Sequence, residues 1–238
     1  MNVKIVENIF QYIEIELAPT EEFITECGAM SYYDYGLSRN VLVGGIFKRI
    51  ITREEVTVIK YKNETSSNKK LLLSSNAFVV PIKIDAVQNE IICAKSAFFC
   101  STKDIQMGMR IDNNVKTGLF GGMGFFRQKI IGQGTIFLKS LGPVKKIELT
   151  GNKIIVDSSA ILAFSNTINY SNKMSNFFAN VFSGEGGSQE ELSGSGTVWL
   201  QCYNEPLKSS PTGCFRCLVC ILVVLAYLFF LILSNIIK

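Results

Sequence analysis

Carboxylates and thiols are the side chains of this sequence that could do chemistry, because the chain contains no histidine. Histidine is the side chain that most often serves as a general base or metal ligand near neutral pH. Two sets of acids lie close enough in the sequence to be considered as catalytic pairs: Glu185 with Glu190 or Glu191, and Asp104 with Asp112. Nothing in their spacing places two carboxylates in one pocket. We therefore expect solvated loop acids, no enzymatic activity, no cofactor and no metal site.

Seven cysteines fall into two groups, four scattered through the chain and three near its C-terminus, at Cys214, Cys217 and Cys220. An odd number without framework spacing indicates reduced thiols. Cys217 and Cys220 have CxxC spacing, but no second pair accompanies them, which argues against a zinc or redox site. Two interpretations of the C-terminal three stay open. They are sites of S-acylation beside a membrane, or they are small apolar residues of a helix.

The C-terminal segment contains seventeen consecutive apolar residues, Cys217 to Leu233, without a charge. A helix of that length rises about 26 Å, close to the thin end of membrane hydrocarbon cores. A buried core helix is the alternative, but the run lacks the helical periodicity of a one-sided helix. The sequence therefore predicts a transmembrane helix and a membrane contact over residues 214–238, after a linker over residues 204–213.

The place of this segment in the chain defines the predicted localisation. A hydrophobic helix at the C-terminus is typical of a tail-anchored, single-pass membrane protein, here with residues 2–203 as a cytosolic N-terminal domain. A short span with weak basic flanks suits the endoplasmic reticulum or the mitochondrial outer membrane, and the sequence does not separate these two.

The part of the chain before the linker repeats itself three times. One block recurs at residues 15–29, 84–97 and 147–160, and a second at residues 51–73, 120–138 and 182–200. The last two copies of the second block lie 62 residues apart, and its first copy is degraded. Spacing this regular across two blocks indicates an internal triplication.

Turn and strand patterns within the repeats favour an all-β fold. Gly132-Gln-Gly134 and Gly194-Ser-Gly196 each separate two apolar strand patterns, as tight turns and bulges do. Three antiparallel sandwiches of about 65 residues each cannot bury large separate cores, whereas around a pseudo-threefold axis they can share one. The predicted fold is therefore three β-sandwich repeats in a pseudo-threefold prism over residues 2–203, plus one C-terminal transmembrane α-helix.

Several of these motifs resemble those of a known family. The segments concerned are Phe120-Gly-Gly-Met-Gly124, Gly132-Gln-Gly134 and Ser193 to Gln201, together with Leu17-Ala-Pro19, Glu26 to Met30 and Asp157 to Phe164. They are similar to signatures of the altered-inheritance-of-mitochondria family, whose members are also described as tryptophan-RNA-binding-attenuator-like proteins. The resemblance covers nearly all of residues 3–203. It implies three attenuator-like β-units in a pseudo-trimer, a role in mitochondrial organisation in fungi, and no family active site to carry over.

The chain departs from the family pattern in three places. Its first repeat lacks the Gly-x-Gly turn and gains Ser66 to Lys70, and Gly187-Ser188 replaces an apolar pair in the third repeat. The hydrophobic C-terminal segment is an addition. These departures are compatible with the fold that the resemblance implies.

Each repeat also carries a Gly/aromatic segment that is a candidate partner or membrane contact. The apolar residues concerned are Ile46, Phe47, Leu119, Phe120, Phe177, Phe178 and Phe182. If the segments are exposed, they form one apolar patch, with Arg127 among the nearby basic residues that could meet acidic headgroups. The alternative is that the aromatic side chains fill a central core.

A membrane-tethered scaffold or interaction protein, with an unknown protein partner and a place in mitochondrial or organelle membrane organisation, fits these features best. The alternative is an RNA- or small-ligand-binding module of attenuator-like fold. Its charge would come from basic residues dispersed along the chain, namely Lys60, Lys62, Lys69, Lys70, Lys145 and Lys146. Since the net charge is only +4 and these lysines form no single run, nucleic acid is not the expected partner.

Overall fold

The computed structural model describes residues 1–6, 11–43, 57–85, 89–103, 105–111, 126–173 and 189–203. They belong to a compact unit from Met1 to Asn204, and a second unit, Glu205 to Lys238, lies outside the described residues. The described part of the compact unit consists of β-strands and one short 3-10 helix, η2 (Ser158–Ala160). A first strand, β1 (Asn2–Val6), precedes the repeats.

The predicted β-sandwich repeats are present, and each uses the same six strand positions, which we call a to f in chain order. In the first repeat these are β2 (Tyr12–Leu17), β3 (Glu22–Glu26), β4 (Met30–Tyr33), β5 (Leu37–Val43), β6 (Thr57–Asn63) and β7 (Lys69–Ser74). In the second they are β8 (Phe78–Ile84), β9 (Glu90–Cys93), β10 (Phe98–Ser101), β11 (Ile105–Ile111), β12 (Phe126–Gly132) and β13 (Gly134–Ser140).

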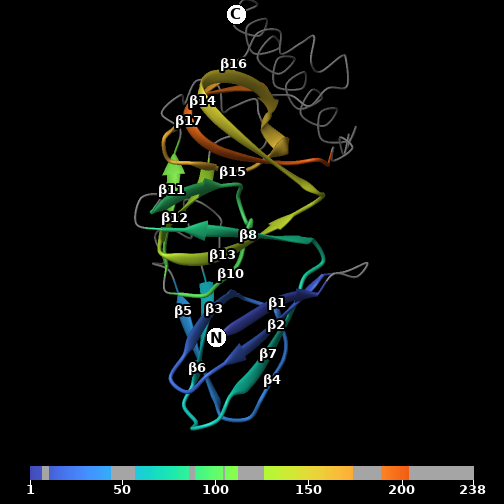
Figure 1. Ribbon diagram of the computed structural model, residues 1–238, viewed down its shortest axis with the longest axis vertical. Helices are drawn as coiled ribbons and strands as arrows, with labels where there is room; N and C mark the ends of the chain where they lie inside the picture. Colours follow the sequence, from blue (N-terminus) through green and yellow to red (C-terminus); the bar gives the residue numbers. More distant parts are fainter. Residues whose placement is uncertain are drawn as a thin grey trace, which may run out of the picture. The chain divides into compact units, whose positions relative to one another are not determined.

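The third repeat forms the same six positions from four strands. Here β14 (Val144–Asp157) supplies a and b, β15 (Ile161–Ser165) is c, β16 (Ile168–Lys173) is d, and β17 (Gln189–Gln201) supplies e and f. The two long strands pair with each other, and their register shifts between Thr150 and Lys153, where a changes to b. Figure 1 shows the three repeats in colour order along the compact unit, from blue through green to orange.

The sheets join one repeat to the next. Within every repeat, a, f and c form one half-sheet, and d, e and b form the other. Strand b of one repeat then pairs with strand c of the following repeat, as β3 with β10 and β9 with β15. The resulting orders are β1-β2-β7-β4, β5-β6-β3-β10-β13-β8 and β11-β12-β9-β15-β17-β14.

Alternating side chains explain why these strands form sandwiches. In β2, Ile13, Ile15 and Leu17 are buried, whereas Glu14 is exposed, as expected for side chains that alternate between the two faces of a strand. Leu71 in β7 joins them in the first core. The segment Leu71 to Leu73, which ends the degraded first copy of the second block, therefore lies in a core-forming strand of the first repeat.

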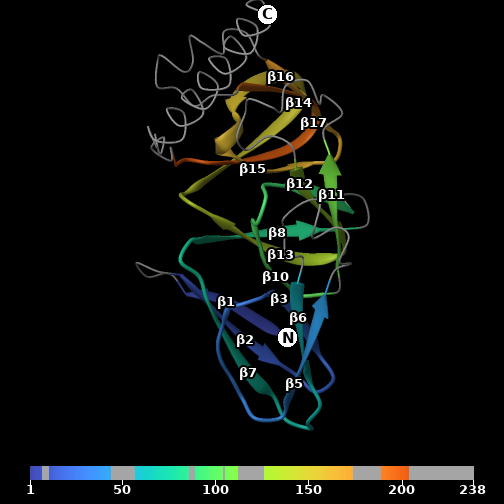
Figure 2. The same cartoon turned by 180° about the vertical axis from the view of Figure 1, so that it is seen from behind.

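The predicted prism around one shared core needs correction. The described residues form three separate hydrophobic clusters, one containing Phe23 and Tyr61, one containing Phe98 and Trp199, and one containing Phe164. Each cluster fills the sandwich of one repeat, and the neighbouring repeat contributes strands to its walls. The repeats therefore stand in series, and the view from behind shows the same succession of layers (Figure 2).

The predicted C-terminal transmembrane helix also needs correction. No helix in the described part of the chain is long and apolar enough to cross a membrane. The described helix, η2, has three residues and rises about 6 Å, against a hydrocarbon core of roughly 30 Å. Residues 214–238, for which the helix was predicted, lie outside the described residues. The fold class is all-β, and the predicted tail-anchored, single-pass localisation in the endoplasmic reticulum or mitochondrial outer membrane is withdrawn with the helix.

Glycine at the bend of β17 provides a test of the repeat geometry. Gly194 has a φ of +113°, and a Cβ there would lie 2.7 Å from the carbonyl oxygen of Thr167, whereas Gly151, with a φ of +94°, has open space around it. Both alanine substitutions cost roughly 1–2 kcal/mol for the left-handed backbone. Only Gly194→Ala adds a steric clash, worth about 1–3 kcal/mol. In urea denaturation we expect the larger loss of unfolding free energy for Gly194→Ala, and equal losses for the two variants would contradict the close approach.

Candidate functional site

A buried ion pair joins the second and third repeats. The Nη2 atom of Arg127 donates to both carboxylate oxygens of Glu190, at 2.6 Å each. The side chain of Arg127 is 8% exposed and that of Glu190 is 4% exposed. Arg127 is the second residue of β12, and Glu190 is the second residue of β17, so the pair links the e strands of successive repeats. A buried pair of this kind holds its two charges in place because neither can be left alone without a large cost.

Two aromatic rings complete the surroundings of this pair. The Cζ atom of Arg127 lies 5.5 Å from the ring centroids of both Phe164 and Tyr170, within the range of cation–π attraction. The Nε atom of Arg127 is buried and has no hydrogen-bond partner among the described residues. With both oxygens of Glu190 bound to the guanidinium, the carboxylate is not free to act as a base. The arrangement ties strands together and offers no visible chemistry.

Arg127 and Glu190 lie near the starts of β12 and β17, the strands that follow two of the three Gly/aromatic segments. These segments fall between β5 and β6, between β11 and β12, and between β16 and β17, which are the same d-to-e connection in each repeat. The proposed contact residues themselves lie outside the described residues; they are Ile46, Phe47, Leu119, Phe120, Phe177, Phe178 and Phe182. Their role stays a prediction. Arg127, which we expected among the basic residues near them, is buried against Glu190 and cannot meet a headgroup.

The other residues considered for chemistry are not brought together. Glu190 and Glu191 are neighbours in β17, so their side chains point to opposite faces, and Glu191 binds Lys153 at 2.9 Å. Asp104, Asp112 and Glu185, and also Cys214, Cys217 and Cys220, lie outside the described residues. In the described part of the chain, no group of three or more histidine, cysteine or acidic side chains could hold a metal ion.

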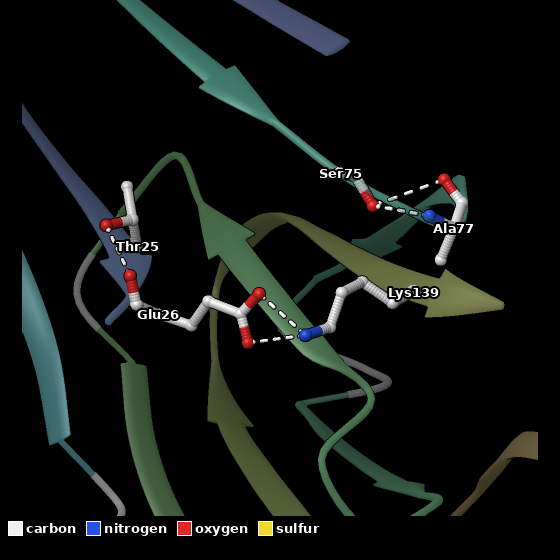
Figure 3. A network of polar contacts seen from close by, with 5 residues as sticks. All are labelled: Thr25, Glu26, Ser75, Ala77 and Lys139. Atoms are coloured by element: carbon white, nitrogen blue, oxygen red, sulfur yellow. Dashed lines mark hydrogen bonds and ion pairs between the residues drawn. The ribbon is translucent and has the colours of Figure 1, made fainter. Parts of the chain in front are cut away.

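A second charged contact lies where the first repeat meets the second. Lys139 of β13 donates to both carboxylate oxygens of Glu26 at the end of β3, at 2.6 Å each, across β10, the strand that lies between them (Figure 3). Burial raises the pKa of Glu26 above its ordinary value, and the ion pair with Lys139 opposes that shift without cancelling it. Burial, and then the charge of Glu26, also raise the pKa of the Cys100 thiol, which keeps that thiol unreactive.

The raised pKa of Glu26 predicts a pH dependence of stability. The folded protein keeps this proton at pH values where the unfolded chain has released it, so the contribution is full below the unfolded pKa and is lost as pH rises through the folded one. Glu26→Gln is neutral at every pH. The unfolding free energy of the wild type minus that of Glu26→Gln should therefore fall as pH rises from about 4 and become constant near neutrality. Urea titrations at several pH values check this, and a difference that increases with pH would contradict it.

Comparison with known proteins identifies a family that matches this chain over its three repeats. The family model described as "Mitochondrial biogenesis AIM24" matches residues 3–203. The chain belongs to this family. The resemblance read from the glycine motifs is thereby confirmed, and the AIM24 match spans all three repeats.

Relatives of this AIM24 chain include bacterial proteins. An uncharacterized protein of Streptococcus pyogenes serotype M6 is 24% identical over 208 residues, which is 82% of each chain. A crystal structure of a Streptococcus pyogenes protein superimposes with a TM-score of 0.67 at 22% identity, covering 85% of this chain and 94% of that one. This similarity shows a shared fold.

Sequence reasoning missed both ion pairs. Arg127 and Glu190 are 63 residues apart, one more than the offset of 62 found for the glycine block, so they do not occupy the same repeat position. Glu26 and Lys139 are 113 residues apart and occupy different strand positions, so the repeat spacing does not relate them either.

Proposed function

We propose that this AIM24 chain is a non-enzymatic interaction protein whose partner binds at a sheet edge. The observation that carries the proposal is the outer edge of β4, the last strand in its sheet. All four residues of β4 are exposed, and Met30, Tyr32 and Tyr33 place apolar surface there, next to Tyr35, which is 98% exposed. Edge strands without charged or proline residues readily pair with another chain.

The buried polar groups support a binding role over catalysis. Arg127 and Glu190 bind each other, Glu26 binds Lys139, and the Cys100 thiol is insulated by burial. Each of these groups lies at a contact between two repeats. Because bacterial relatives share the fold, the binding role we propose does not depend on a mitochondrion.

The alternative of RNA binding has less support in the described residues. Lys60 and Lys62 both lie near Glu22, at 3.1 and 3.9 Å, and Lys146 binds Glu148 at 2.7 Å. Half of the six lysines that were considered as a phosphate contact thus lie beside a carboxylate, with Glu22 shared between two of them. An interaction with another protein therefore remains the better proposal.

Complementation of a strain that lacks this chain tests the proposal with two opposite variants. Tyr32→Lys places a charge on the exposed edge and should abolish complementation while the far-UV spectrum and unfolding midpoint stay unchanged. The paired substitution Arg127→Met with Glu190→Leu removes the buried charges and should complement as the wild type does. The reverse pattern would contradict the proposal, because it would show that the buried charges do the work.

A further inference from the structure

Among the described strands, each end of the repeat series has an unpaired strand edge, and these two edges are of the kinds that pair with each other between successive repeats. Inside the chain, strand b of one repeat pairs with strand c of the next, as β3 with β10 and β9 with β15. This leaves strand c of the first repeat, β4, and strand b of the third, the second half of β14, each at the end of its sheet order. No described strand pairs with either outer edge. The two edges belong to the repeats at opposite ends of the series (Figure 1).

The exposed side chains at these edges correspond to buried ones at the internal junctions. Strand c has a register shift at the same place in all three repeats: between Met30 and Tyr32 in β4, between Phe98 and Cys100 in β10, and between Ile161 and Ala163 in β15. Tyr32 is therefore equivalent to Cys100, and it is 47% exposed where Cys100 is fully buried. In the second half of β14, Ile155 is 57% exposed.

The exposed residue of strand b also corresponds to a buried residue at an internal junction. The equivalent of Ile155 in the first repeat is Ile24 of β3, which is 3% exposed because β10 covers it. Four apolar side chains, Met30, Tyr32, Tyr33 and Ile155, thus lie in water at positions that the internal junctions bury. The exposed apolar surface is what remains where the repeated junction has no next repeat to pair with.

We propose that the partner of these edges is a second copy of this chain, bound head to tail, so that β4 of one copy pairs with the second half of β14 of another. The inference rests on the proposed interaction function and names its partner. The joined half-sheets would have the strand order d-e-b-c-f-a, which is the order of both complete internal sheets. Continuity with an interface already formed twice favours this occupant over an unrelated protein.

The internal pairs also fix the register of the proposed junction. Cys100 lies opposite Thr25, and Ala163 lies opposite Cys93. At the equivalent positions of β4 and β14, both pairs place Tyr32 opposite Val156. The residue pairs that follow them in the two internal junctions place Tyr33 opposite Ile155. No two like charges face each other in this register, since β4 has no charged residue. Because the two surfaces differ, the association is heterologous and gives a ring or an open fibre of repeats.

Disulfide trapping between two populations of the full-length chain tests the register. One population carries Tyr33→Cys and the other Ile155→Cys, and the mixed sample is oxidised and digested. We expect a peptide that links the two substituted positions. Identification of the linked peptide separates this product from any made by the native cysteines. The matched control is Val41→Cys, which is 49% exposed on β5, another strand at the end of a sheet, and should not link to Ile155→Cys.

Three results would overturn the inference: absence of the link, equal linking to Val41→Cys, or a link within one chain when both substitutions are made together. Tyr32→Lys provides a second measurement, and sedimentation velocity should show at least a tenfold weaker self-association than for the wild type. If the link is absent but Tyr32→Lys still abolishes complementation, the head-to-tail partner is wrong and the proposed interaction function stands. If complementation survives Tyr32→Lys, the interaction function itself fails.

Discussion

Arg127→Met should lower the free energy of unfolding by about 4 kcal/mol, the largest loss that we expect from any single substitution in this chain. The reason is that Glu190, 4% exposed and bound at 2.6 Å through both oxygens, would keep a buried charge without its partner. The loss of the guanidinium over Phe164 and Tyr170 adds a smaller term. Urea denaturation of the purified chain measures the difference.

The double variant Arg127→Met with Glu190→Leu decides whether charge or packing causes that loss. Removing both charges also removes the desolvation penalty, so we expect its stability to lie within about 1 kcal/mol of the wild type. Lys153→Met is the exposed control, because its ion pair with Glu191 lies at the surface and should be worth less than about 0.5 kcal/mol. A double variant as unstable as the single one would show that the side-chain volumes matter and the charges do not.

Asn63→Ala should cost about 3 kcal/mol, because it leaves buried groups without hydrogen bonds. Asn63 is fully buried, and its Nδ2 donates to the carbonyl oxygens of Leu17 and Ser67 at 2.9 and 2.8 Å. Its Oδ1 accepts from the N–H and the hydroxyl of Thr65. In the strand register, Asn63 occupies the place of Gly132 and Gly194, so it organises the longer loop that replaces the Gly-x-Gly turn in the first repeat.

The matched control for this loop is Asn68→Ala. Asn68 lies in the same connection, but its amide binds Glu16 at 3.1 Å on the exposed surface. We expect a loss of less than about 0.5 kcal/mol for this variant. Thermal unfolding followed by circular dichroism compares the two. Similar midpoints for Asn63→Ala and Asn68→Ala would mean that the buried amide does not hold the loop.

The strands and the triplication could be predicted from the sequence because their signals are local. Alternation in segments such as residues 12–17 shows which face is buried, and the two Gly-x-Gly motifs mark the e-to-f turns at Gly132 and Gly194. The pairing between repeats could not be predicted in this way. The apolar side chain of Ile24 in β3 indicates that the residue is buried, but does not indicate that β10 of the next repeat buries it.

This missing information explains the error of the threefold prism. A prism closes only if the b-to-c junction is made three times, and the chain makes it twice. The character of Tyr32 and Tyr33 does not reveal the difference, because aromatic residues fit both a buried and an exposed edge. The buried pair of Arg127 and Glu190 was likewise hidden, since charged residues are assigned to the surface unless a partner is known.

The three sandwiches form an open series, and amide hydrogen exchange of the dilute, monomeric chain tests this most directly. Amides of β3, β9, β10 and β15 at the internal junctions should be strongly protected. The outward-facing amides of β4 and of the second half of β14 should exchange nearly as fast as those of an unstructured peptide, and should gain protection as the protein concentration rises. Equal protection of both sets in the monomer would show a closed ring of repeats and contradict the open series.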